Sequence, residues 1–417
     1  MDITLHPAAA AGRLSAIPSK SHVHRLLICA TLSDKKTDII CSSSSADIDA
    51  TVGALNSLGA HITSENGVIS VDPIKKLPNH PTLDCGESGS TLRFLLPVIA
   101  ALGCGADLLC RGRLASRPLS PLKEALEAHG AVIRQQGNVI SLSGKLSGGE
   151  FSFAGNVSSQ FATGLLLAFP LCSEESSLTL TGKIESLPYI NITLSVLSSF
   201  GIETSVNAQT YSEHGKYTSL GTIKAEGDWS NAAFMLAAGA FSDEGVTVYG
   251  LDTGSAQGDS KIVDILHSFG ASCTLSGDSV CVKKGSLNAF LVDAAQMPDL
   301  VPIISVIAAL ANGRTVIKNC GRLRLKESDR IESVCAMIRS LGGNIENVGE
   351  DLIIDGKSRL SGGIVDSFGD HRIVMAASVA SLMCDSPVTI LNAQAANKSY
   401  PAFFEDFRSV TKRKVSL

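Results

Sequence analysis

Cationic side chains gather at the start of an apolar segment near the beginning of the chain. The stretch "IPSKSHVHRLLICATL" (17–32) is apolar enough for a buried helix, yet its first turns carry Lys20 and Arg25 beside His22 and His24. The start of a helix already presents partial positive charge, so further cations are unfavourable there unless an anion lies nearby. The sequence therefore predicts an anion-binding site at this helix start.

Five more apolar segments begin with polar residues. Their starts lie at Ser90, Ser159, Ser230, Asp299 and Asp370, and from Ser21 onward the gaps are 69, 69, 71, 69 and 71 residues. The starts also carry side chains that bind phosphate or carboxylate: Arg93, Ser158, Gln160, His371 and Arg372. If the helices of one domain run the same way, their N-termini converge and the free amides form an anion-binding region. The alternative is a structural repeat whose helix starts are merely capped by Ser and Asp, which would account for Ser230.

Two carboxylates lie among the cations of the later segments. Asp299 follows Met297-Pro298, and Glu327 lies between Lys326 and Arg330. Positive neighbours stabilise a carboxylate as the anion, so either residue could act as a base, and Glu327 could carry a proton. The sequence "KESDR" also fits a helix start capped by Ser328 or Asp329. Further cations occur in the loops and together favour a multiply anionic small ligand: Arg111, Arg113, Arg117, Arg322, Arg324 and Lys398.

A second repeat shows which elements hold these residues. Five segments, LNSLG, LEAHG, LSSFG, LHSFG and IRSLG, end in glycines spaced 71, 71, 69 and 72 residues apart. A glycine just past a helix suits a left-handed C-cap, and a polar turn and a strand follow most copies. Each repeat is therefore predicted to contain a buried helix, a strand, an amphipathic helix and further strands, in that order. Six such units predict two domains of three, with a boundary near 225–228.

Composition restricts the function further. A chain of 417 residues is long enough for two domains, and its net charge of −5 argues against nucleic-acid or polybasic membrane surfaces. Eleven cysteines without a C-x-x-C pair suggest a reducing cytosol, and no metal-ligand spacing is visible. The apolar run 300–311 is too short to span a bilayer. We expect a soluble, cytoplasmic protein that contacts neither nucleic acid nor membrane.

Taken together, the motifs resemble one family over essentially the whole chain. "PSKSxxxR", "SGSTLR", "VSSQF", "PYI", "MPD", "LKESDR", "GDHR" and "NKSYP" have the order and spacing of the 5-enolpyruvylshikimate-3-phosphate (EPSP) synthases. The resemblance implies a two-domain inside-out α/β fold of six β-α-β-α-β-β repeats, three per domain. The implied domains are 13–227 and 1–12 plus 228–417. The implied reaction adds the 5-hydroxyl of shikimate-3-phosphate to phosphoenolpyruvate and then expels phosphate.

The resemblance also implies roles for particular residues. Asp299 would take the hydroxyl proton and Glu327 would protonate the enol methylene, with Lys20 and His371 nearby. The set implied for shikimate-3-phosphate is Lys20, Ser21, Arg25, Ser158, Ser159, Gln160, Ser186, Tyr189, Asp299 and Lys326. The set implied for phosphoenolpyruvate is Lys20, Gly89, Arg117, Gln160, Arg330, Arg372 and Lys398. We expect no metal or organic cofactor, no partner beyond the two substrates, and a monomer.

Some residues depart from the family pattern. "GESGS" (86–90) stands where Gly-Asn-Ala-Gly-Thr is frequent, Arg322 stands where Asn is common, and Pro18 replaces a glycine. We expect these changes to leave the reaction class intact, whereas the affinities and the response to glyphosate do not follow from the family pattern. The nearest alternative is transfer of enolpyruvyl to UDP-N-acetylglucosamine, but that family usually has a cysteine where this chain has Gly112. An RNA-end-processing protein on a similar repeat is disfavoured by few aromatics and the acidic charge.

Overall fold

The computed structural model describes residues 1–412 and forms two compact units. Unit 1 holds Met1–Ile17 and the chain from Glu226 onward, and unit 2 holds Pro18–Ala225. Each unit has its own hydrophobic core. Within residues 1–412, no helix combines the length and the apolar character needed to cross a membrane.

Three helices fill the core of unit 2. They are α1 (Lys20–Leu32), α3 (Gly89–Leu102) and α5 (Ser159–Ala168), and almost every residue in them is buried. A helix that is apolar on all sides can only be stable inside a core, as the sequence pattern predicted. Three further helices pack around them: α2 (Ala46–Ser57), α4 (Leu122–Ala128) and α6 (Leu187–Ser199).

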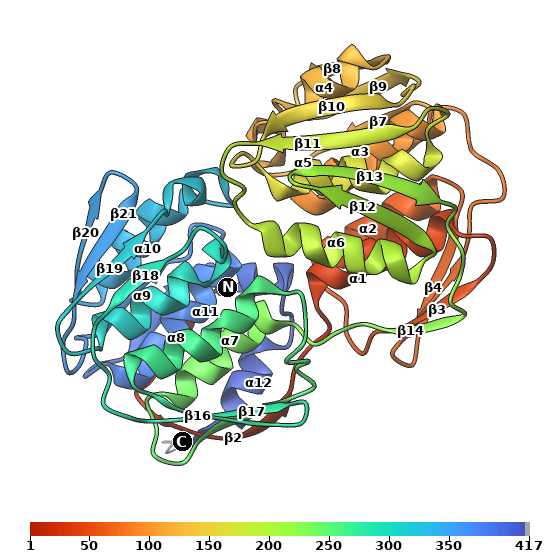
Figure 1. Cartoon of the computed structure of the whole chain (residues 1–417). Helices are drawn as coiled ribbons and strands as arrows, with labels where there is room; N and C mark the ends of the chain where they lie inside the picture. Colours follow the sequence, from red (N-terminus) through yellow and green to blue (C-terminus); the bar gives the residue numbers. More distant parts are fainter. Residues whose placement is uncertain (413–417) are drawn as a thin grey trace. The chain divides into compact units, whose positions relative to one another are not determined.

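Three four-stranded sheets of unit 2 share one topology. Their strand orders are β14-β3-β5-β4, β6-β7-β9-β8 and β10-β11-β13-β12, and in each sheet the first pair is parallel and the others are antiparallel. Figure 1 shows β11 and β13 in front of α3 and α5, so sheets lie outside the buried helices. The strands are β3 (Thr37–Ile40), β4 (His61–Glu65), β5 (Val68–Asp72), β6 (Thr82–Asp84), β7 (Ala106–Leu109), β8 (Ala131–Gln136), β9 (Val139–Gly144), β10 (Gly149–Ala154), β11 (Ser176–Thr181), β12 (Ile202–Asn207), β13 (Thr210–Gly215) and β14 (Thr222–Lys224).

Unit 1 repeats this plan with the later part of the chain. Its buried helices are α7 (Trp229–Gly239), α9 (Val301–Ala309) and α11 (His371–Ala380), and its outer helices are α8 (Ile262–Phe269), α10 (Arg330–Ser340) and α12 (Phe403–Ser409). Its sheets have the orders β18-β19-β21-β20, β16-β17-β15-β2-β24 and β1-β23-β22. The strands are β1 (Ile3–Leu5), β2 (Ala9–Ser15), β15 (Gly245–Tyr249), β16 (Ser272–Ser276), β17 (Ser279–Lys283), β18 (Leu291–Asp293), β19 (Arg314–Lys318), β20 (Asn344–Val348), β21 (Asp351–Asp355), β22 (Gly363–Asp366), β23 (Val388–Leu391) and β24 (Thr411–Lys412).

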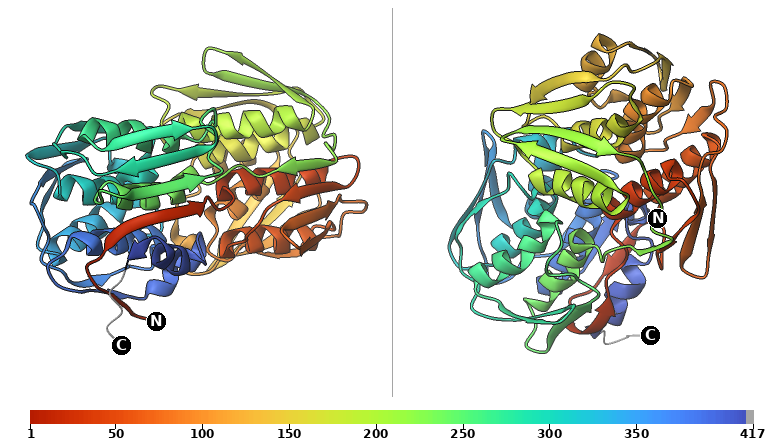
Figure 2. Two further views of the ribbon diagram at one scale, coloured as in Figure 1. Left: turned by 90° about the horizontal axis from the view of Figure 1, so that it is seen from below. Right: turned by 45° about the vertical axis from the view of Figure 1, so that its right-hand side comes forward.

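The chain crosses between the units after Ile17 and after Ala225. The second crossing agrees with the boundary near 225–228 that the repeat predicted, whereas the family resemblance implied crossings after residues 12 and 227. Strand β2 continues through Ser15 because it pairs in parallel with β15, which keeps Gly12 and Arg13 inside the sheet of unit 1 (Figure 2). Similarly, β14 stays in unit 2 by pairing with β3. Each strand that precedes a crossing therefore belongs to the unit that the chain is leaving.

The glycines that end the outer helices have the predicted conformation. Gly59, Gly130, Gly201, Gly270 and Gly342 all have positive φ angles, between 81° and 107°. Such angles are strained for residues with a Cβ atom. At Gly59 a Cβ atom would also lie 2.6 Å from the carbonyl oxygen of Lys76.

The caps of three buried helices differ from the sequence interpretation. The side chains that accept from the first free amides belong to Ser88, Ser158 and Asp228, rather than to Ser90, Ser159 and Ser230. Several hydroxyl or carboxyl groups stand side by side at each start, and the backbone angles decide which one caps. The hydroxyls of the following residues are thereby left in the first helical turn.

Candidate active site

Lys20 lies at the first position of α1 and is held by an acid on the neighbouring helix. Its Nζ is 2.8 Å from Oδ2 of Asp47 on α2, and both side chains are largely buried. The side chain of the cap residue Ser19 accepts no hydrogen bond from the first amides of α1. Ser21 follows in the same turn and is half-buried. This helix start therefore carries a cation beside an acid of the neighbouring helix.

Arg25 is buried and joins three helices. Its guanidinium donates to Oγ1 of Thr193 at 2.8 Å, to Oγ1 of Thr163 at 3.1 Å and to the carbonyl oxygen of Tyr189 at 2.9 Å. It also lies 4.9 Å from the ring centre of Phe94. Burial lowers the pKa of Arg25 to about 9. Most of its donors are used within the protein, so Arg25 positions the start of α6, which carries Tyr189.

Gln160 is held between two buried helices. Its Oε1 accepts from Nη1 of Arg93 at 2.6 Å, and its Nε2 donates to Oγ of Ser90 at 3.1 Å. Arg93 also donates to the carbonyl oxygen of Pro118. The starts of α3 and α5 are therefore joined by one polar network.

Gly89 begins α3 and brings its backbone close to Arg117. A Cβ atom at this position would lie 2.8 Å from Nη1 of Arg117 and 3.4 Å from Oε1 of Gln160. The Nε atom of Arg117 is buried and has no hydrogen-bond partner among residues 1–412. The three residues predicted to bind phosphoenolpyruvate in unit 2 besides Lys20 thus lie together.

The remaining predicted residues of unit 2 lie at the starts of α5 and α6. Ser158 caps α5 through the amide of Gln160, at 3.3 Å, and Ser159 follows it in the first turn. Ser186 precedes α6 with a left-handed φ of 56°, and Tyr189 lies in the first turn. Arg25 donates both to the carbonyl oxygen of Tyr189 on α6 and to Thr163 on α5, so it holds these two helices together.

Asp299 is the centre of the predicted site in unit 1. It lies in the short turn η4 (Pro298–Leu300) before α9, and three cations contact its carboxylate. Nη1 of Arg330 lies at 2.8 Å, Nζ of Lys326 at 3.1 Å and Nη2 of Arg372 at 3.1 Å. Burial alone would raise the pKa of Asp299, but Arg372, Lys326 and Arg330 outweigh it and hold the pKa well below its ordinary value.

Arg330 is fully buried and bonds three carboxylates. Besides Asp299, it contacts Oε2 of Glu327 at 2.5 Å and Oδ2 of Asp370 at 2.8 Å. Burial disfavours its charged form, yet Asp370, Glu327 and Asp299 hold its pKa above the ordinary value. The same burial is the main reason that the pKa of Lys326 is lowered. This cluster balances three carboxylates against Arg330, Lys326 and Arg372.

Helix starts again supply these groups. Arg330 opens α10, whose cap is Asp329, so the helix-start interpretation of "KESDR" is confirmed, while its proposed chemistry stays a prediction. His371 and Arg372 open α11, which Asp370 caps through the amide of Arg372 at 2.9 Å. His371 is buried, with Nδ1 3.8 Å from Oδ1 of Asp370. Lys398 ends the turn η7 (Ala393–Lys398) and is half-buried.

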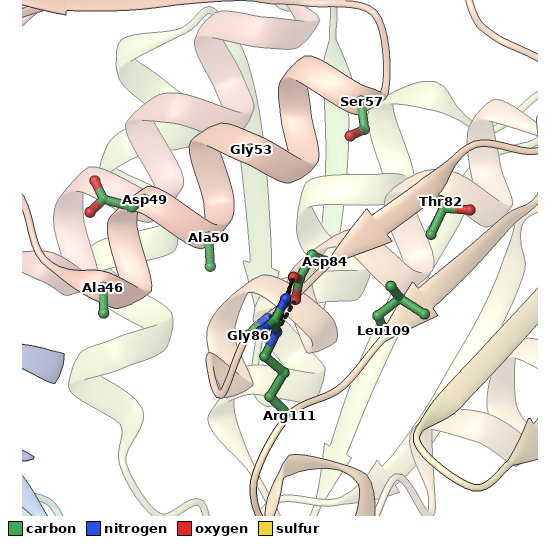
Figure 3. Close-up of a pocket in the computed structure, with 10 residues that line it drawn as sticks. All are labelled: Ala46, Asp49, Ala50, Gly53, Ser57, Thr82, Asp84, Gly86, Leu109 and Arg111. Atoms are coloured by element: carbon green, nitrogen blue, oxygen red, sulfur yellow. Dashed lines mark hydrogen bonds and ion pairs between the residues drawn. The ribbon is translucent and has the colours of Figure 1, made fainter.

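A separate pocket of about 440 Å³ lies in unit 2 between α2 and the ends of β6 and β7 (Figure 3). It is lined mainly by small residues of α2 and by the ion pair of Arg111 with Asp84. None of the predicted site residues lines it. Arg111 is therefore paired on the surface and takes no part in the predicted helix-start site.

Sequence reasoning missed several residues that support the site. Asp47, Thr163 and Thr193 bond the two cations of α1, and Asp259 lies close enough to Asp299 to be coupled to it electrically. Burial and the charge of Asp299 raise the pKa of Asp259 to about 6. The polar residues are spaced too far apart in the chain for any local pattern to reveal these contacts.

Comparison with known proteins places this arrangement in a family. The sequence matches the family "EPSP synthase (3-phosphoshikimate 1-carboxyvinyltransferase)" over residues 6–407. It is 38% identical to the 3-phosphoshikimate 1-carboxyvinyltransferase of Clostridioides difficile (strain 630), covering 99% of this chain and 98% of that protein. It is also 38% identical to the protein of the same name from Clostridium perfringens (strain SM101 / Type A), covering 98% of both.

Solved structures show the same fold. The EPSP synthase of Acinetobacter baumannii superposes with a TM-score of 0.81 at 24% identity, covering 98% of each chain. The enolpyruvyl transferase NikO of Streptomyces tendae superposes with a TM-score of 0.78 at 16% identity, covering 99% of this chain and 97% of that one. These identities are too low to say more than that the architecture is shared. The match over residues 6–407 and the 38% identity over almost the full length, by contrast, show that the chain belongs to the EPSP synthase family, the 3-phosphoshikimate 1-carboxyvinyltransferases.

Proposed function

We propose that this protein transfers the enolpyruvyl group of phosphoenolpyruvate to the 5-hydroxyl of shikimate-3-phosphate and releases phosphate, a step of aromatic amino-acid biosynthesis. The observation that carries the proposal is the continuous family match over residues 6–407, which includes both clusters of charged helix starts. The substrates carry phosphate and carboxylate groups. Free amides, Arg and Lys at helix starts suit both.

The residues of unit 2 are proposed to bind both substrates. Ser158, Ser159, Ser186 and Tyr189 lie at helix starts around Arg25 and would hold shikimate-3-phosphate. Arg117 has a buried donor without a partner among residues 1–412, and it lies beside Gly89 and Gln160. A phosphoenolpyruvate oxygen would satisfy that donor.

The cluster of unit 1 is proposed to exchange partners when phosphoenolpyruvate binds. Arg330 and Arg372 each donate to Asp299, and Arg330 also donates to Glu327. A substrate carboxylate that takes over these donors would release Asp299 and Glu327 from part of their ion pairs. Their affinity for a proton would rise as cationic contacts are lost.

Proton transfer then follows from these roles. Asp299 accepts the proton of the 5-hydroxyl of shikimate-3-phosphate while the hydroxyl oxygen bonds to C2 of phosphoenolpyruvate. At the same time, protonated Glu327 donates its proton to C3. In the second half, the Glu327 carboxylate takes a proton back from C3, the double bond re-forms, and the C2–O bond to phosphate breaks. The leaving phosphate takes up the proton that Asp299 had accepted, so both carboxyl groups return to their starting forms. Lys20 and His371 would stabilise the charges that develop, and no step uses a metal ion.

The direct test is phosphate release from phosphoenolpyruvate with each candidate acceptor. We expect release with shikimate-3-phosphate and none above background with UDP-N-acetylglucosamine. Mass spectrometry of the product should show the enolpyruvyl ether of shikimate-3-phosphate. Release with UDP-N-acetylglucosamine alone would contradict the proposal in favour of the sister reaction.

A further inference from the structure

Four side chains form a buried line of hydrogen bonds from α1 across α2 to the start of α3. Nδ1 of His24 lies 2.7 Å from Oγ1 of Thr51, which lies 2.6 Å from Oγ1 of Thr91. Thr91 donates in turn to Oγ of Ser88 at 2.7 Å. All four side chains are inaccessible to solvent.

The direction of the protons follows from the last bond. Because the hydroxyl of Thr91 donates to Ser88, it must accept from Thr51, and Thr51 must accept from His24. His24 therefore carries a proton on Nδ1. Burial lowers the pKa of His24 to about 3, with Lys20 and Arg25 acting in the same direction against Asp47, so the imidazole is neutral and Nδ1 holds its single proton. Its Nε2 has no hydrogen-bond partner among residues 1–412.

A second contact runs beside this line. Lys20 on α1 and Asp47 on α2 form their ion pair four residues before His24 and Thr51, respectively. Residues four apart lie on the same helix face, so α1 and α2 are joined by two successive contacts. The first contact holds Lys20, and the second leads on to α3.

The far end of the line lies where α3 begins. Ser88 is the cap of α3 and also accepts from the amide of Thr91 at 3.2 Å. Gly89 follows it, with Arg117 and Gln160 against its backbone. The line therefore connects the two elements that carry Lys20 and Gly89, both of which belong to the proposed phosphoenolpyruvate site.

We propose that His24, Thr51, Thr91 and Ser88 are positioning residues that hold the first turn of α3 at a set distance from Lys20 and thereby determine the affinity for phosphoenolpyruvate. The inference rests on the proposed function. None of His24, Thr51 and Thr91 contacts a substrate; each acts through the helix starts it joins. The residues proposed to bind shikimate-3-phosphate through α5 and α6 lie outside this line.

Replacing Thr51 by Val tests the inference. Val has nearly the same shape but neither accepts from His24 nor donates to Thr91. Loss of a buried hydrogen-bond partner is worth a factor of about ten or more in an equilibrium. We expect the KM for phosphoenolpyruvate to rise about tenfold by that estimate, while the Kd for shikimate-3-phosphate, measured by calorimetry without the second substrate, stays within about twofold. Thr51→Ser restores the hydroxyl and should restore the KM.

Two other Thr→Val changes serve as matched controls. Thr31 lies on α1, and its buried hydroxyl has no partner among residues 1–412, so Thr31→Val should change neither constant. Thr163 bonds Arg25, which in turn bonds Tyr189. Thr163→Val should therefore lower the affinity for shikimate-3-phosphate more than the affinity for phosphoenolpyruvate. A general loss of packing would weaken the binding of both substrates in both variants. It would not weaken mainly phosphoenolpyruvate binding in Thr51→Val and mainly shikimate-3-phosphate binding in Thr163→Val.

Three results would overturn the inference. They are an unchanged KM in Thr51→Val, an equal loss of affinity for both substrates, and a KM that Thr51→Ser does not restore. If Thr51→Val fails to fold, Thr91→Val provides the same comparison. Nitrogen NMR of the wild-type protein gives an independent test, because an imidazole of His24 protonated on Nε2 would also contradict the proposed line. That measurement needs no substrate, whereas failure of the proposed function would appear as absent phosphate release in the wild type.

Discussion

Buried carboxylates behave in opposite ways in this protein, depending on what surrounds them. Asp299 is surrounded by Arg330, Arg372 and Lys326, and these charges keep it ionised although it is buried. Glu213 on β13 is more fully buried and has no hydrogen-bond partner among residues 1–412, and burial raises its pKa well above the ordinary value. The first arrangement keeps a carboxylate ionised, as its proposed role as a base requires, and the second reduces the stability of the fold once the carboxyl ionises.

Glu327→Gln tests the proton carrier at the residue scale. Gln keeps the size of the side chain and an oxygen that can accept from Arg330, but it cannot donate a carboxylic proton. We expect turnover to fall by about two to four powers of ten, the usual contribution of general acid–base catalysis. Binding of shikimate-3-phosphate should remain nearly intact by calorimetry. Glu332→Gln, at an exposed side chain that contacts Arg324, is the control and should keep full activity. Full activity in Glu327→Gln would remove this residue from the mechanism.

Glu213→Gln tests the unpartnered carboxyl. Because the folded state holds the proton more tightly than the unfolded state, stability falls as pH rises above the unfolded pKa of about 4.3. Gln cannot ionise, so the stability of the variant relative to wild type should increase between pH 4 and pH 8 in urea unfolding. Glu203 on the adjacent strand β12 is exposed, and Glu203→Gln should show little such trend. A constant difference for Glu213→Gln across this range would show that the carboxyl is not buried in its neutral form.

At the scale of elements, the buried helices approach one another very closely. Gly164 on α5 faces the backbone of α3, and a Cβ atom there would lie 2.3 Å from the carbonyl oxygen of Arg93. Since Arg93 also holds Gln160, the distance between α3 and α5 bears on the site as well as on the core.

Gly164→Ala should therefore destabilise the protein by forcing these helices apart. Overpacking of a core typically costs about 1–3 kcal/mol, and thermal or urea unfolding would measure the loss. Gly53 on α2 provides the control, because a Cβ atom there meets nothing within 4 Å. Gly53→Ala should stabilise the protein by up to about 1 kcal/mol through helix propensity. Equal effects of the two changes would contradict the proposed contact between α3 and α5.

At the scale of the whole molecule, the residues proposed to bind phosphoenolpyruvate come from both units. Lys20, Gly89 and Arg117 belong to unit 2, whereas Arg330, Arg372 and Lys398 belong to unit 1. The chain passes from one unit to the other at Ile17-Pro18 and at Ala225-Glu226.

The sequence by itself determined the repeated elements and the positions of the helix starts. Local causes explain this success: an all-apolar segment must be buried, and a glycine with positive φ ends a helix whatever lies around it. For example, Gly130 and Gly342 are left-handed as predicted, and His371 opens α11 directly after Asp370, where the sequence placed the start of an apolar segment.

Only the tertiary structure decided which groups meet. Lys20 and Asp47 are 27 residues apart, and Arg25 and Thr193 are 168 apart, so each contact depends on how whole helices pack. The same holds for the crossing after Ile17. Its place is set by the pairing of β2 with β15, and all of unit 2 lies between these two strands in the sequence. Local propensity acts over a few residues, whereas packing brings together residues that no local pattern relates.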